Sequence, residues 1–92
     1  MQEKSYKMPE AITFKTVNTV LRQLHQSLSN IHSDEWVVDL HAVQHFDSAG
    51  LALLIEAKRM ASNNNKILKV VGASNRLVAL SKFCGVDVVL DD

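Results

Sequence analysis

The alternation of strand-like and helix-like segments limits what this chain can fold into more than any other feature. Trp36–Leu40 is rich in β-branched and aromatic residues and predicts a central strand, and the Leu- and Ala-rich run Leu51–Ala61 predicts a helix after it. An earlier amphipathic helix is predicted from Lys15 to about Asn30 by apolar residues at i, i+3, i+4, i+7 and i+11. These residues are Val17, Val20, Leu21, Leu24 and Leu28.

The second half of the chain continues this alternation. Ile67–Val71 predicts a strand, Gly72 the turn that follows, and Ser74 the N-cap of a third helix that stops at Gly85. Val86–Leu90 predicts a last strand. Because parallel neighbours need a helix-length connection, this order predicts an α/β fold with an at least partly parallel sheet. A chain this short can hardly cover both faces of a sheet, so we expect the helices mainly on one face.

Length and charge indicate a single small domain and argue against a nucleic-acid-binding protein. Ninety-two residues, 47% of them hydrophobic, describe one domain, for which we expect a tail or edge strand over residues 1–11 and the domain proper over residues 12–92. Ten basic and ten acidic residues leave no net charge to attract nucleic acid. The longest apolar run, Leu51–Ile55, is too short to span a membrane, and the first residues contain no apolar stretch of the kind expected in a secretion signal. Cys84 is the one cysteine, so no disulfide is expected within the chain. We therefore expect a cytoplasmic protein without a nucleic-acid partner.

The middle of the chain resembles the signature of STAS domains, which is a V-x-D-L strand, a short loop and a D-[ST]-[SA]-G-L sequence that opens a helix. Here the motif reads Asp47-Ser48-Ala49-Gly50-Leu51. The resemblance extends from about Ile12 to Leu90. It implies a single STAS-type domain, with a mixed sheet of four to five strands and three to four helices. It also implies a non-enzymatic module that docks on protein partners and needs no cofactor.

Two branches of the family fit the motif. Anti-sigma-factor antagonists dock on a kinase that phosphorylates the second hydroxyl residue of D-S-S-G-L, whereas STAS subunits of the Mla phospholipid transporter bind the ATPase of that ABC transporter. The second position here is Ala49, which cannot accept phosphate, although Ser48 keeps a hydroxyl. The resemblance favours the bacterial MlaB-type subunit, which associates with the inner membrane through the ATPase and helps to maintain outer-membrane lipid asymmetry. The alternative is an anti-sigma factor antagonist that is switched by phosphorylation of Ser48.

The residues expected to bind the partner lie in the motif and the helix it opens. Asp47 or Ser48 is placed to cap the helix, and Gly50 to let a partner backbone approach closely. The helix carries two apolar faces; either a partner covers part of this area, through which isolated domains can also form homodimers, or both faces are buried within the domain. These faces are Leu51, Leu54 and Ile55, and Leu53, Ala57 and Met60. The predicted contact set is His45, Asp47, Ser48, Ala49, Gly50, Leu51, Leu53, Leu54 and Ala57.

The remaining chemistry-bearing residues give weaker signals. His41 and His45 are four residues apart but flank a strand end, with no acidic or cysteine ligand at matching spacing, so we predict no metal site and place them beside the docking surface. His25 and His32 are expected to be exposed. The Gly-x-Ser-x-Gly pattern is absent and the three glycines are far apart, so neither a catalytic serine nor a phosphate-binding loop is indicated.

Overall fold

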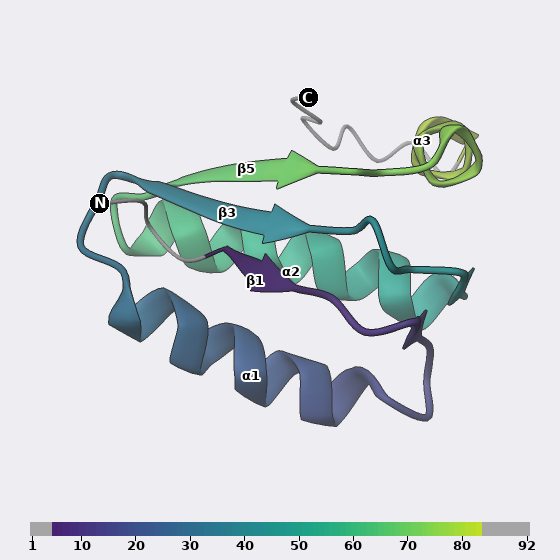
Figure 1. Cartoon of the computed structure of the whole chain (residues 1–92), viewed down its shortest axis with the longest axis horizontal. Helices are drawn as coiled ribbons and strands as arrows, with labels where there is room; N and C mark the ends of the chain where they lie inside the picture. The colour runs from purple at the N-terminus through teal and green to yellow at the C-terminus, as the bar shows by residue number, and fades with distance from the viewer. Residues whose placement is uncertain (1–4, 84–92) are drawn as a thin grey trace.

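Two small parallel sheets form the β-structure within residues 5–83 (Figure 1). The computed structural model describes the backbone of residues 5–83 and the side chains of residues 5–79. Three strands pair in the order β1-β3-β5, with Tyr6 opposite Val38 and Val38 opposite Val70. They are β1 (Tyr6–Lys7), β3 (Glu35–Asp39) and β5 (Ile67–Val71). The second sheet joins β2 (Ala11–Ile12) to β4 (His45–Phe46).

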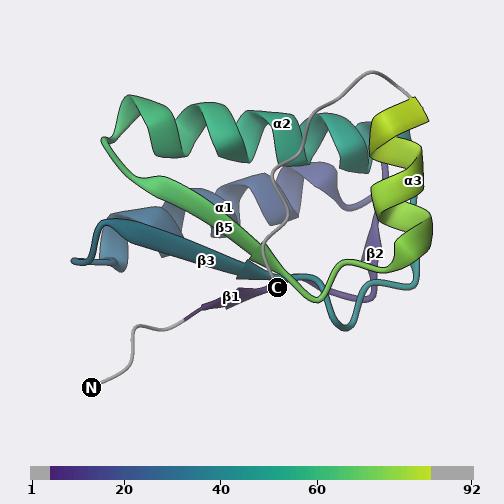
Figure 2. The same cartoon turned by 90° about the horizontal axis from the view of Figure 1, so that it is seen from above.

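The two long helices lie on the same face of the three-stranded sheet. Helix α1 (Val17–Asn30) connects β2 to β3, and helix α2 (Ser48–Asn63) connects β4 to β5. Because crossovers between parallel strands are right-handed and the strand order advances in one direction, both helices are placed on one side. Figure 2 shows this layer, with helix α3 (Asn75–Phe83) running across the end of the sheet. The expected α/β architecture is confirmed.

The core fills the space between this sheet and the two helices. Trp36 and Val38 of β3 have no exposed surface, whereas the alternate residues Val37 and Asp39 are partly exposed on the other face. The indole N–H of Trp36 donates to Ser27 Oγ at 3.0 Å, so its polar atom is satisfied. The helix residues in the core are Val20, Leu24, Leu28, Leu53, Leu54, Ala57, Met60, Ala61 and Leu77.

Most of the predicted elements are found close to their expected limits. The first helix ends at Asn30, β5 has the predicted bounds, and Ser74 Oγ accepts from the Leu77 N–H at 3.1 Å as an N-cap. Gly72 has φ +75°, the left-handed conformation that its turn requires. Every strand pair within residues 5–83 is parallel, so the antiparallel pair of a mixed sheet is not among them. The predicted strand Val86–Leu90, with Cys84 and Gly85, lies outside the described residues.

Candidate docking site at the start of helix α2

Asp47 connects the first turn of α2 to the turn before α1. Its Oδ1 accepts from the backbone N–H groups of Ala49 at 2.9 Å and Gly50 at 3.1 Å, which caps the helix as predicted. Its Oδ2 accepts from the Phe14 N–H, 3.1 Å away in the turn before α1. The Phe14 hydrogen bond, with those of Gly50 and Ala49, lowers the pKa of the Asp47 carboxyl below its ordinary value. Both carboxylate oxygens therefore accept hydrogen bonds from within the domain.

Gly50 is buried against the chain's own backbone, which corrects the expectation that it serves a partner. A Cβ at this position would overlap the Ile12 carbonyl oxygen and lie 3.1 Å from the Ile12 carbonyl carbon. Ile12 belongs to β2 and has no exposed surface. The motif therefore has glycine at this position because the first turn of α2 rests directly on a strand.

Most of the predicted apolar contact residues are buried in the monomer. Leu51, Leu53, Leu54 and Ala57 are each at most 6% exposed, so both apolar faces of α2 are buried within the domain except at Ile55, which is 45% exposed. The second face, Leu53, Ala57 and Met60, belongs to the core, as expected of a helix that is apolar on two sides. These four predicted contact residues lie in the interior, below the exposed residues of α2.

One row of α2 remains at the surface, and it begins at Ser48. Residues at i, i+4, i+7, i+11 and i+14 lie along one side of a helix, and all five in this row are exposed. We call this row the α2 stripe. It consists of Ser48, Ala52, Ile55, Arg59 and Ser62. Among the described residues none hydrogen-bonds to the Ser48 hydroxyl, while the adjacent Ala49 is partly buried.

Two apolar residues at this surface were not in the predicted contact set. Phe14 is 70% exposed beside the first turn of α2, and Ile55 is 45% exposed in the α2 stripe. Helical spacing could have separated Ile55 from the buried Leu54, because it lies seven residues after Ser48. No comparable signal marks Phe14, since strand alternation would place it on the same face as the buried Ile12.

The four histidines are at the surface, and His41 contacts a carboxylate. His41 Nδ1 lies 2.6 Å from Asp39 Oδ1, and the same oxygen accepts the His41 backbone N–H, which lowers the pKa of the Asp39 carboxyl. His45 is exposed in β4, next to the start of α2, where it was expected. His25 and His32 are exposed as predicted.

The whole of this geometry lies within the region that matches a known protein family. The sequence model of a family described as MlaB, STAS domain, matches residues 9–91. The chain belongs to the MlaB-type STAS domain family. No curated protein matches the chain. Within residues 5–83 no helix is long and apolar enough to cross a membrane.

The signature motif of this STAS domain divides into an internal and an external part. Asp47 and Gly50 act inside the domain, one as a cap that ties α2 to the Phe14 turn and the other as the contact with β2. Ser48 is the motif residue that extends into solvent. The motif thus builds a fixed turn and presents one hydroxyl on it.

Proposed function

We propose that this STAS domain is a non-enzymatic cytoplasmic subunit that binds the ATPase of an Mla-type phospholipid ABC transporter. Through the ATPase it associates with the inner membrane, and it supports the transport that maintains outer-membrane lipid asymmetry. The docking site is the turn at Ser48 together with the α2 stripe.

The match to the MlaB family over residues 9–91 is the observation that carries this proposal. Ala49 supports it, because a chain regulated by phosphorylation at the second motif position would need a hydroxyl there. The exposed turn supports it as well. Its backbone is held by Asp47 and by the β2 contact, so a partner meets a preformed surface.

The alternative function is an anti-sigma factor antagonist that binds an anti-sigma kinase. The exposed Ser48 hydroxyl favours keeping this alternative, because a kinase can reach it. A phosphate on Ser48 would stand beside the Asp47 carboxylate at the contact surface, where charge repulsion and desolvation would oppose docking.

Co-purification from the native bacterium tests the two functions together. The tagged chain is expected to retain the ATPase of the Mla-type transporter, and the complex is identified by mass spectrometry. Retention of an anti-sigma kinase instead, together with an 80-Da mass increase on the chain after incubation with that kinase and ATP, would establish the alternative. A folded chain that retains no ABC ATPase contradicts the proposal.

A further inference from the structure

We infer that the docking site accepts an acidic protein surface with an apolar pocket, in which Phe14 and Ile55 are the anchors. The inference rests on the proposed function and specifies the kind of surface that the ATPase must present.

Phe14 has the properties of an interface anchor. Its ring is 70% exposed, yet its backbone N–H is fixed to Asp47 Oδ2 at 3.1 Å, so the ring extends from a backbone already held in place. Burying an aromatic side chain in a partner's pocket removes a large apolar area from water, and such residues dominate binding energies. Little backbone order has to be gained when this ring is buried.

Ile55 is the second exposed apolar residue of the site. It lies seven residues along the α2 stripe from Ser48, which is about 10 Å at the rise of an α-helix. Ala52 lies between them and adds little bulk, so a partner could approach the helix closely there. The exposed large apolar residues in the described part of the chain are Phe14, Ile55 and Ile67. Two of the three therefore belong to this site.

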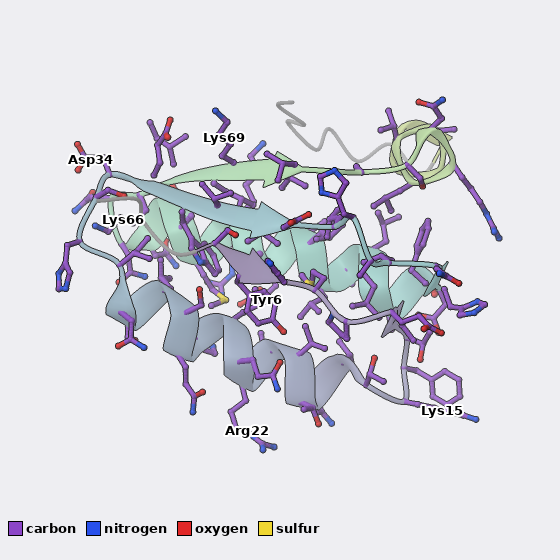
Figure 3. All side chains as sticks on the ribbon, viewed as in Figure 1. Tyr6, Lys15, Arg22, Asp34, Lys66 and Lys69 are labelled. Atoms are coloured by element: carbon purple, nitrogen blue, oxygen red, sulfur yellow. The ribbon has the colours of Figure 1, made fainter. Side chains whose placement is uncertain are left out.

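Among the described residues, the cations of α1, α2 and the turns just before them outnumber the carboxylates, although the whole chain is neutral. Glu56, the one acidic residue within α1 and α2, is paired through both carboxylate oxygens with Arg59. The other ionised side chains within α1, α2 and the turn before α1 are cations. They are Lys15, Arg22 and Lys58. Figure 3 shows Lys15 and Arg22 pointing outward from the start and the outer side of α1.

Lys15 lies next to the aromatic anchor. Its Nζ is 5.9 Å from the centroid of the Phe14 ring, and both side chains are exposed. The nearby Asp47 carboxylate is also charged, but its oxygens accept backbone N–H groups, two of them at the positive end of α2, which compensate part of its charge. A complementary partner therefore places carboxylates around the pocket that receives Phe14.

Binding measurements with the purified ATPase of the Mla-type transporter test this inference. Phe14→Ala and Ile55→Ala are expected to weaken binding by roughly tenfold or more, the effect typical of interface anchors. Ile67→Ala is the matched control, because Ile67 is 65% exposed at the start of β5, near the other end of α2, and its loss should leave affinity unchanged. Lys15→Gln is expected to weaken binding and Lys15→Glu to weaken it further, and added salt should weaken wild-type binding.

The outcomes separate this inference from the proposed function. If the wild-type chain does not bind the ATPase, the proposed function fails. If it binds but Phe14→Ala behaves like Ile67→Ala, or if Lys15→Glu binds as tightly as wild type, the inference fails while the function stands. Phe14-dependent binding to phosphatidylglycerol vesicles, or Phe14-dependent dimerisation in light scattering at the concentrations used, would overturn the assignment of this surface to an acidic protein.

Discussion

Substitution of Gly50 by alanine should destabilise the domain, although alanine is the better helix former. A Cβ on residue 50 would overlap the Ile12 carbonyl oxygen and lie 3.1 Å from its carbon and 3.2 Å from its Cγ1. Two of these three atoms are backbone, so relief requires α2 or β2 to move. Such overpacking costs about 1–3 kcal/mol, against a gain of at most about 1 kcal/mol from helix propensity. With the full propensity gain subtracted, the expected net loss is about 0–2 kcal/mol, or a melting temperature lower by up to about 16 °C.

Urea unfolding followed by the fluorescence of Trp36 measures this change. Trp36 is the one tryptophan of the chain and has no exposed surface, so its emission reports the loss of the core. Ala52→Gly, at an exposed position of the same helix, is the control for propensity and should cost about 1 kcal/mol. If propensity alone decided stability, the two substitutions would have opposite signs. A Gly50→Ala protein at least as stable as wild type would refute the packing argument.

Three further outcomes are expected. Leu54→Ala, in the core, should lower the free energy of unfolding by about 2–5 kcal/mol, while Ile55→Ala should change it by at most about 0.5 kcal/mol. Equal losses of the two proteins in urea unfolding would contradict the burial assigned to these residues. The lowered pKa of Asp47 predicts stability that is complete above the ordinary carboxyl range and is lost as the pH falls below about 4. Asp47→Asn should flatten this part of a stability-against-pH curve, and an unchanged curve would exclude the linkage. Ser48→Glu should weaken ATPase binding in a pull-down by roughly tenfold or more with an unchanged melting temperature, and unaltered affinity would remove Ser48 from the site.

The end of α1 and the positions of β3 and β5 could be predicted because they depend on local pattern. The spacing of Val20, Leu24 and Leu28 fixes which side of α1 is buried, whatever that side packs against. β5 is likewise bounded by Asn65, with φ 58°, and Gly72, with φ +75°, whose turns end the extended segment on both sides. These features need no knowledge of distant parts of the chain.

The roles of the motif residues could be predicted only in part, because they depend on contacts far along the chain. That Asp47 would cap α2 followed from its position, but its hydrogen bond to Phe14 joins residues 33 positions apart. Gly50 was assigned to a partner because nothing in the sequence places Ile12 beside it. The same limit applies to Leu53, whose burial in the core depends on elements that lie elsewhere along the chain.

The arrangement around Asp47 has a consequence for the kinetics of association. Because the turn is tied to a strand and to the segment before α1, the loop that carries Ser48 does not have to search for its bound shape after an encounter. Collisions in the correct orientation are then productive at once, and the association rate should follow diffusion and electrostatic attraction rather than a slow rearrangement. Differences in affinity among substitutions at Phe14 or Ile55 should accordingly show as changes in the lifetime of the complex.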